Sequence, residues 1–430
     1  MYSVTMEKDL AAYRDSVEGV EVRLPARHLA GFVEITEPPA MPLPGGIAAA
    51  FEAPVGSPPL RELARGARRV AVIVSDATRG VPTALVLPHI VSECAAAGVS
   101  EDRIVVVVAL GVHRGATEAE MREILGGLSG RIAIENHEPF DASRLVFLGT
   151  TSRGTPVEVN RTVVECDLRV AVGKVEPHEF AGFSAGRKSV LPGVCSERTI
   201  LVNHRPEMIL HPLARTGQME GNPISEDMVE AAKLLGRLFT VNLAVNAHNA
   251  PVACFAGDLE AAHERAVAFL RGYLEVRLET SPDVILTTPG RPLNCNFYQA
   301  IKPLIACEPL LAEGGVMALY AECCEGCGTE DMFIPYAGAT CPAEVTERLK
   351  GNYRIQMDHA LLLCKIMGRG LKIVAHSPHV EAAAFRSLFI EPAASPQAAL
   401  DAACAMSGKP DPRVLIFPQP QRTLPVLGRG

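Results

Sequence analysis

Two histidines and a lysine lie in or beside one glycine- and serine-rich segment of this chain. The segment reads KVEPHEFAGFSAGRKSVLPG from 174 to 193, and Asn203 and His204 follow it. Glycine lets a backbone approach a ligand closely because no Cβ intervenes. Histidines at this density are candidates for proton transfer or metal ligation. His178, Lys188 and His204 therefore form the primary candidate site.

Two earlier loops carry further ionisable residues. Asp76 and Arg79 are spaced as Asp-x-x-Arg, which suits either an anion site or a local salt bridge that shapes the turn. Gly111 and His113 follow the next apolar run. His113 is either an acid/base group or a solvent-facing or capping residue.

Several familiar motifs are incomplete. Lys188 suits a phosphate binder, a covalent anchor or a surface lysine, but Arg187 stands where a P-loop needs glycine. No His-Glu-x-x-His pattern is present. Cys323, Cys324 and Cys327 include a spacing that suits zinc, yet no second ligand pair is evident, so a turn with reduced thiols is the other interpretation.

A third polar stretch lies in the last third of the chain. Tyr298, Gln299 and Lys302 fall within one predicted helical turn, with Tyr298 and Lys302 on the same face. They suit contact with a polar substrate, or the polar face of an ordinary amphipathic helix.

The elements that position the first two loops are short β-branched runs followed by helices. Residues 69–75, 104–110 and 168–172 predict buried parallel strands. Pro82 predicts a helix start that leads to an end at Gly98, and Thr117 with Glu120 predicts a capping box. Ligands bind at the carboxyl ends of such strands, which is where these loops lie.

The length of 430 residues predicts two domains. We expect an N-terminal α/β domain over 1–277, which carries the candidate site of His178, Lys188 and His204, and a C-terminal α/β domain over 278–430, which carries the 298–302 stretch. We predict an α/β fold class with mostly parallel sheets, and we expect the active site in the interdomain cleft. The first 60 residues predict an irregular arm with a few strands, and the tail from about 410 is expected either to stay with its own domain or to pack back on the first.

Composition excludes several classes of binding partner. A net charge of −8 without a basic run argues against nucleic acid. No apolar run approaches the ~20 residues of a membrane helix, and no secretory signal is evident. Twelve cysteines without a signal predict reduced thiols and a cytoplasmic location.

Taken together, five motifs resemble the nickel-pincer-dependent lactate racemase family. They are the 75–79 turn, the His113 loop, the 174–193 segment, the Asn203-His204 pair and the 296–302 stretch, in family order. The resemblance implies a nickel-pincer nucleotide, a pyridinium mononucleotide with two thiocarbonyl arms that hold nickel, tethered to Lys188. It also implies His204 as the remaining nickel ligand. It further implies cofactor contacts from four residues: Asp76, Thr78, Ser184 and Gly186.

The same resemblance implies an isomerase that racemises or epimerises a lactate-like 2-hydroxy acid by reversible hydride transfer. One histidine of the pair His113 and His178 takes the hydroxyl proton, and the other returns it on the opposite face. Arg79 and Lys302 hold the carboxylate and assist catalysis, and Arg79, Tyr298, Gln299 and Lys302 contact the substrate. Cofactor-biosynthesis proteins are implied partners.

Alternatives stay open at this stage. The same cofactor suits an epimerase of a longer sugar acid. A non-catalytic nickel or nucleotide carrier needs only Lys188 and His204, so the retention of His113 and His178 argues against it. A hydrolase that uses histidine and a zinc ion is a further alternative, but the sequence has no zinc-ligand triad at a useful spacing. The substrate's side chain and a homo-oligomeric state are not specified by the sequence.

Overall fold

A computed structural model describes residues 2–42 and 45–428, which form two compact units. The N-terminal unit comprises Glu37–His204 and Leu213–Tyr273, and the C-terminal unit comprises the residues up to Thr36, Arg205–Pro212, and the chain from Leu274 on. The chain therefore passes between units at four points.

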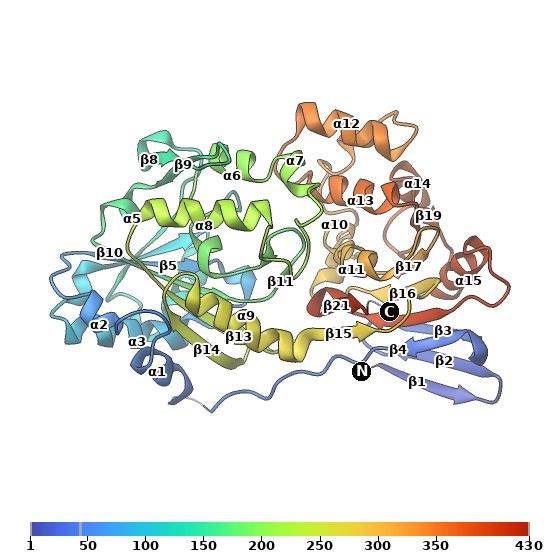
Figure 1. Ribbon diagram of the computed structural model, residues 1–430, viewed down its shortest axis with the longest axis horizontal. Helices are drawn as coiled ribbons and strands as arrows, with labels where there is room; N and C mark the ends of the chain where they lie inside the picture. The colour runs from blue at the N-terminus through green and yellow to red at the C-terminus, as the bar shows by residue number, and fades with distance from the viewer. Residues whose placement is uncertain (1, 43–44, 429–430) are drawn as a thin grey trace. The chain divides into compact units, whose positions relative to one another are not determined.

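The N-terminal unit is built on a six-stranded sheet in the order β14-β13-β10-β5-β6-β7. Only the pairing of β13 with β14 is antiparallel. The strands are β5 Val70–Ser75, β6 Ile104–Ala109, β7 Ala133–Asn136, β10 Leu168–Lys174, β13 Leu238–Val245 and β14 Pro251–Gly257. Its helices are α1 Gly45–Glu52, α2 Leu60–Leu63, α3 Thr83–Ala96, α4 Glu118–Leu125, α5 Arg161–Glu165, α6 Glu197–Asn203, α8 Pro223–Leu235 and α9 Ala261–Leu274 (Figure 1). A hairpin of β8 Leu145–Thr150 and β9 Pro156–Asn160 completes it.

The three predicted strands of this unit are confirmed as β5, β6 and β10. Their valines and isoleucines are fully buried, because a central parallel strand is covered on both faces. The predicted helix after Pro82 is α3, and Gly98 follows its end with a φ of +84°. The capping box at Thr117 is also confirmed at the start of α4.

The C-terminal unit contains a second six-stranded sheet, all parallel, in the order β19-β18-β17-β16-β20-β4. The strands are β4 Leu29–Phe32, β16 Val284–Thr288, β17 Val316–Tyr320, β18 Lys372–His376, β19 Glu391–Pro392 and β20 Val414–Pro418. Its helices are α7 Pro206–Ile209, α10 Phe297–Ala300, α11 Lys302–Cys307, α12 Pro342–Asn352, α13 Asp358–Gly368, α14 Ala382–Ser387 and α15 Pro396–Met406. Both units thus have the predicted α/β class with mostly parallel sheets.

The opening residues differ from the expected irregular arm of the first domain. Strands β1 Tyr2–Glu7, β2 Leu10–Asp15 and β3 Val20–Pro25 form an antiparallel sheet, and β4 extends the C-terminal unit's sheet beside β20. The alternating apolar positions Tyr13, Val20 and Val22 pack into the core that contains Leu400. This apolar face explains why the segment joins the C-terminal unit.

The tail also stays with the C-terminal unit. Strand β21 Leu424–Leu427 pairs in parallel with β15 Glu275–Leu278. The tail therefore belongs to the C-terminal unit, which was one of the two expectations.

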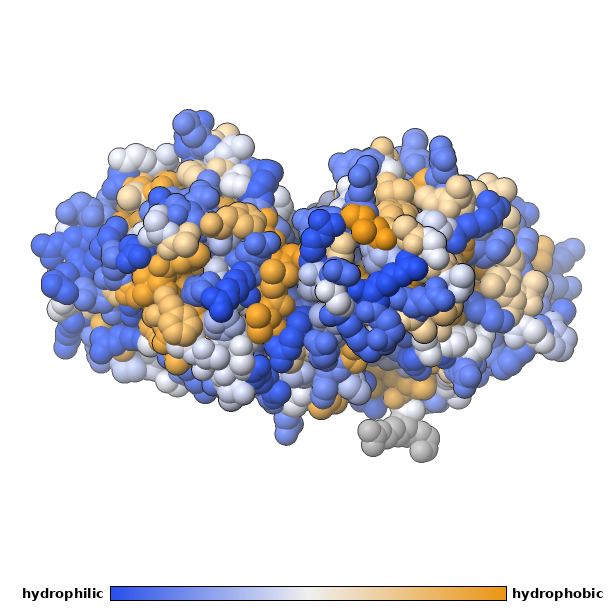
Figure 2. Space-filling model, turned by 90° about the horizontal axis from the view of Figure 1, so that it is seen from above, coloured by the Kyte–Doolittle hydropathy of each residue, from blue (hydrophilic) through white to orange (hydrophobic). Residues whose placement is uncertain are grey.

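The surface is mixed in character. The face drawn in Figure 2 shows hydrophilic residues interleaved with smaller apolar areas. Within the described ranges, no helix has the length and apolar character needed to cross a bilayer.

Candidate functional site

The loops after β5 and β6 are brought together by the sheet itself. The two strands are paired in parallel up to Ser75 and Ala109, so their following residues emerge at one edge. The loop after β6 is also tied to the 174–193 segment, because the amide of Gly111 donates to the carbonyl of Gly193 at 2.9 Å. Gly111 adopts a φ of +55°, which glycine tolerates best.

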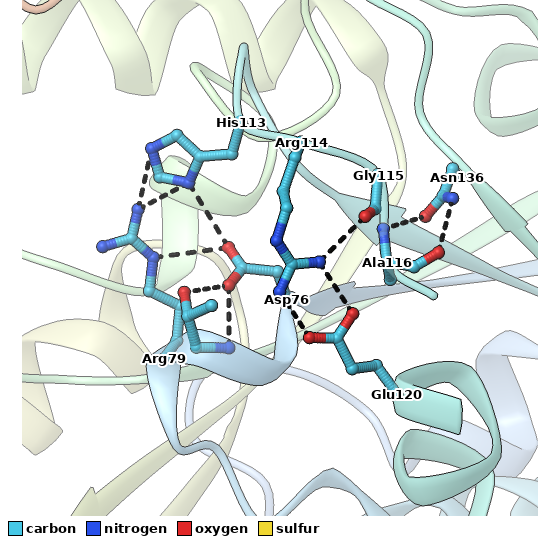
Figure 3. A network of polar contacts seen from close by, with 9 residues as sticks. Asp76, Arg79, His113, Arg114, Gly115, Ala116, Glu120 and Asn136 are labelled. Atoms are coloured by element: carbon cyan, nitrogen blue, oxygen red, sulfur yellow. Dashed lines mark hydrogen bonds and ion pairs between the residues drawn. The ribbon is translucent and has the colours of Figure 1, made fainter. Parts of the chain in front are cut away.

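Asp76, Arg79 and His113 form one network at this edge (Figure 3). Arg79 Nη2 lies 3.0 Å from His113 Nδ1, and Arg79 Nε lies 3.4 Å from Asp76 Oδ2. His113 Nδ1 is also 3.6 Å from Asp76 Oδ2. Arg79 Nη2 also lies 3.2 Å from His113 Nε2, so Nε2 can accept its hydrogen bond while Nδ1 faces the Asp76 carboxylate. The arrangement places the imidazole of His113 between the guanidinium of Arg79 and the carboxylate of Asp76.

Asp76 supplies the fixed negative charge of this network. Burial alone would raise its pKa, but contacts from His113 and Thr78 and the charge of Arg79 outweigh burial and hold the pKa well below its usual range. Both the amide and the hydroxyl of Thr78 donate to Asp76 Oδ1. Thr78, predicted as a cofactor contact, thus orients the carboxylate that faces Arg79 and His113.

The His113 loop is braced from outside by a second set of contacts. Arg114 binds both carboxylate oxygens of Glu120, at 2.8 and 2.6 Å, and donates to the carbonyl of Gly115 (Figure 3). Asn136 exchanges two hydrogen bonds with the backbone of Ala116. The loop is therefore held by side chains from α4 and β7.

The second cluster is organised by Phe180, which the sequence reasoning missed. The ring of His178 meets the Phe180 ring edge-on with centroids 4.7 Å apart, and the His204 ring does so at 5.1 Å. Lys188 Nζ lies 6.0 Å from the centre of the same ring. Phe180 thus gathers the three residues that the sequence singled out. The signal for it was its place two residues after His178.

Lys188 and His204 are both shifted toward their neutral forms. Burial lowers the pKa of Lys188 to about 7, and the nearby Arg79 charge acts in the same direction. Burial and the charge of Lys188 lower the pKa of His204 to about 3. The buried Nδ1 of His204 has no hydrogen-bond partner among the described residues. An uncharged amine and an uncharged imidazole are the forms that bind covalently or ligate a metal.

His204 is held in place through its neighbour. It follows α6, and Asn203 Nδ2 donates to Asp227 Oδ2 at 2.7 Å. The same fully buried carboxylate accepts hydroxyl hydrogen bonds from Thr151 and Thr155. Asp227, on α8, was not predicted, and it fixes the end of the helix from which His204 projects.

Ser184 and Gly186 shape the backbone between the two histidines. The Ser184 hydroxyl donates to the carbonyl of Lys174 at 2.6 Å and accepts from the amide of Glu176. Gly186 has a φ of +51°, and a Cβ there would lie 3.0 Å from the ring of His263. Their predicted cofactor contacts stay a prediction, and the structure gives both a scaffolding role.

We expect acid to destabilise the fold through its buried histidines. Burial lowers the pKa of His137 to about 4 and that of His263 to about 3. Below about pH 6.5 the unfolded chain binds protons that the folded chain does not, so stability is full above that value and falls as the pH drops. The free energy of unfolding should therefore fall less steeply in His137→Gln. Between pH 6 and 5 we expect its slope to be smaller by about 1.4 kcal/mol per pH unit. Urea unfolding at each pH measures this, and an unchanged slope would contradict it.

The third predicted group lies in the C-terminal unit. Tyr298 belongs to α10, and Lys302 begins α11 after a break at Ile301, so the stretch is two short helices rather than one. Pro303 explains the break, because proline lacks the amide that a continuing helix needs. The Tyr298 hydroxyl donates to Asp358 Oδ1 at 3.2 Å, and the Tyr298 ring stacks on His359. The backbone amide of Gln299 donates to Asn296 Oδ1, which caps α10.

The cysteines of the C-terminal unit are free thiols. Cys323 is buried and Cys324 is exposed. Their turn is tied to the residues before α10 and to its first turn. The Cys323 amide donates to Asn294 O at 2.7 Å, and the Tyr298 amide donates to Cys327 O at 3.1 Å. Across the described ranges, no three His, Cys, Asp or Glu side chains are grouped as a metal site.

These features define a two-unit α/β protein. Ionisable side chains, among them Asp76, Arg79 and His113, gather at the carboxyl edge of its first sheet. Two sequence families match this protein, the lactate racemase N-terminal domain over residues 16–217 and the lactate racemase C-terminal domain over 277–421. Lactate racemase of Thermoanaerobacterium thermosaccharolyticum is 37% identical over 305 residues, 70% of each chain. Lactate racemase of Lactiplantibacillus plantarum is 36% identical over 304 residues, 70% of this chain and 72% of that one.

Solved structures agree. The lactate racemase apoprotein from T. thermosaccharolyticum matches with a TM-score of 0.87 and 30% identity, covering 96% of this chain and 98% of that chain. A protein from Thermotoga maritima shares the fold with a TM-score of 0.64 at 19% identity over 87% of this chain and all of that one. The chain belongs to the lactate racemase family, as the resemblance predicted, and is thus an isomerase that uses a cofactor.

Proposed function

We propose that this protein interconverts the stereoisomers of a small 2-hydroxy acid of the lactate type. One observation carries the proposal: His113 and His178 lie on different loops, which follow β6 and β10 of the first sheet. His113 accepts from Arg79, and His178 shares the Phe180 ring with Lys188 and His204. Inversion at carbon needs a base on each side of the substrate, and we assign these two roles to His113 and His178 because they come from separate loops.

The residues present fit a nickel-pincer nucleotide. Lys188 has an amine whose pKa of about 7 leaves much of it neutral and able to form a thioamide tether. His204 offers a neutral imidazole whose Nδ1 lacks a partner among the described residues, which suits a single protein ligand to a metal otherwise held by the cofactor's own donors. When bound, such a group accepts the hydride of the substrate carbon and returns it.

The remaining chemistry falls to side chains of this protein. One of His113 and His178 takes the proton of the substrate hydroxyl, and the other returns a proton after the planar carbon is attacked from its opposite face. Arg79 lies beside His113, so it can bind the substrate carboxylate and polarise the carbonyl that forms. We assign Lys302 the same task, and we assign Tyr298 and Gln299 to substrate contact. Asp76 holds Arg79 in place and is assigned, with Thr78, Ser184 and Gly186, to the cofactor region.

The expected result is interconversion of D- and L-lactate by protein made in cells that also produce the cofactor-biosynthesis proteins, which we propose as its partners. Chiral chromatography of a panel from lactate to polyhydroxy acids measures it. If only the longer acids were converted, the protein would be an epimerase of sugar acids and not a racemase of lactate. The control is protein from cells without the biosynthetic proteins, which should be inactive.

The same preparation tests the tether. Intact mass and peptide mapping should show a nucleotide-sized adduct on the peptide that contains Lys188, and Lys188→Arg should remove it. An adduct without conversion of any acid would indicate a carrier and contradict the enzymatic proposal. Activity without an adduct would contradict only the tether.

A further inference from the structure

Five successive backbone carbonyls, those of residues 180–184, each accept a hydrogen bond from a donor outside that stretch. Asn222 Nδ2 donates to Phe180 O at 2.9 Å, and the Gly217 amide donates to Gly182 O at 3.0 Å. Arg187 Nη2 lies 2.8 Å from Ala181 O and 3.1 Å from Phe183 O, and His263 Nε2 lies 2.7 Å from Ser184 O. In helices and sheets, backbone amides supply the hydrogen bonds that carbonyls need. In this stretch, side chains supply most of them.

Arg187 is the centre of this arrangement. It is the largest of the fully buried side chains, with 2% of its surface exposed. No carboxylate within the described ranges forms an ion pair with it, and its Nε has no hydrogen-bond partner there. Burial of this cation without a counter-ion is costly, and its hydrogen bonds to two backbone carbonyls offset part of that cost. Its polar contacts are the two carbonyls, His263 and Met219 Sδ.

His263 has its tautomer set by the same contacts. Its Nε2 faces Ser184 O at 2.7 Å, and a carbonyl only accepts, so Nε2 carries the hydrogen. Arg187 Nη1, at 3.2 Å from the same nitrogen, then faces a donor rather than an acceptor. The ring must stay neutral beside this cation, and its lowered pKa of about 3 agrees with that requirement.

The held stretch lies between the groups of the candidate site. Phe180 begins it, His178 precedes it in the short strand β11 Pro177–His178, and the stretch ends four residues before Lys188. The strand β12 Gly182–Phe183 pairs with β11, so clamping the carbonyls of β12 also fixes His178. Gly182 itself packs against the backbone of the neighbouring turn, because a Cβ there would lie 2.2 Å from Gln218 O.

We propose that Arg187 and His263 are positioning residues that hold the 180–184 backbone so that His178 and Phe180 keep their orientation toward Lys188. The kinetic consequence rests on the proposed function, while the structural consequence does not. A displacement of about 1 Å at a catalytic group lowers turnover by about 10²-fold.

The test uses the full chain with Arg187→Lys and Arg187→Met, followed by hydrogen–deuterium exchange of the peptide spanning 177–184. We expect exchange there to rise about tenfold or more in both variants, because two carbonyls lose their donor. Exchange in the peptides of β5 and β6 should stay within about twofold of the original protein. The matched control is Arg169→Met, which removes a half-buried arginine that also donates to a backbone carbonyl, that of Val163 at 2.9 Å. Exchange at 177–184 should be unchanged in that control.

A second pair of variants keeps the proposal testable if the Arg187 variants fold poorly. In His263→Gln the side-chain amide can still donate to Ser184 O, and in His263→Leu it cannot. We expect His263→Gln to restore most protection at 177–184 and His263→Leu to lose it. In protein that is active, Arg187→Lys and His263→Leu should lower kcat by about 10²-fold with KM within about twofold.

Three results would overturn the inference: unchanged exchange at 177–184 in the Arg187 variants, an equal rise across the whole N-terminal unit, or no difference between the two His263 variants. Exchange is measured on protein without cofactor. A failure of the proposed function therefore appears as an inactive original protein, whereas a failure of this inference appears in the exchange pattern.

Discussion

His178→Asn and His113→Asn each abolish interconversion of the enantiomers, with turnover lowered by about 10²- to 10⁴-fold in both directions. In the proposed scheme, racemisation passes through both histidines in either direction, so we expect the loss of one to stop the cycle. Asparagine keeps a polar side chain of similar size near Cβ but cannot take a proton. Chiral assay of the two single variants, with cofactor loading checked by mass, measures the effect.

A surface histidine of the same unit serves as the control for these variants. His248 is exposed in the turn between β13 and β14, and its substitution with asparagine should leave turnover unchanged. If either His113→Asn or His178→Asn retains the full rate, inversion does not use two histidines. Loss of the cofactor in either variant would make the residue a binding group instead.

His204→Ala should lose its nickel while keeping the adduct on Lys188, with metal affinity lowered by more than about 100-fold. The imidazole is buried and neutral, and its Nδ1 has no partner among the described residues, so it is free of competing bonds. Nickel per protein, measured by mass spectrometry after desalting, is the readout.

The N-terminal unit provides a matched control for this substitution. His137 is also buried, with a lowered pKa and an unpartnered Nδ1 among the described residues, but its Nε2 bonds to the carbonyl of Cys195. His137→Gln should retain stoichiometric nickel. Retained nickel in His204→Ala would remove His204 from the ligand set.

The sequence is sufficient for the elements whose structure depends on local pattern. The runs that became β5, β6 and β10 are too apolar for any place but a covered sheet, and Thr117 specifies its own cap. Parallel pairing then places the loops of Asp76 and His113 at one edge without further information. This much of the candidate site follows from strand ends alone.

Contacts between residues distant in the chain could not be predicted in this way. Phe180 has the appearance of a core residue, and only the folded hairpin shows that it touches His178, His204 and Lys188. Asp227 lies 24 residues from Asn203 on an amphipathic helix, where a buried carboxylate is not expected. Arg187 was considered only as the wrong residue for a P-loop, although it is buried and holds the segment's carbonyls.

The pairing of β4 with β20 has a consequence for how this protein is made. β4 ends at Phe32 and its partner β20 begins at Val414, so a ribosome adds roughly 380 residues between them. At 5–20 residues per second, that is about 20 to 80 s during which an apolar edge strand is in the cell without its neighbour. The N-terminal unit can be completed within that interval, since its last residue is Tyr273. Strand β4 is thus synthesised long before β20, and it can take its place in the sheet of the C-terminal unit only after β20 has been made.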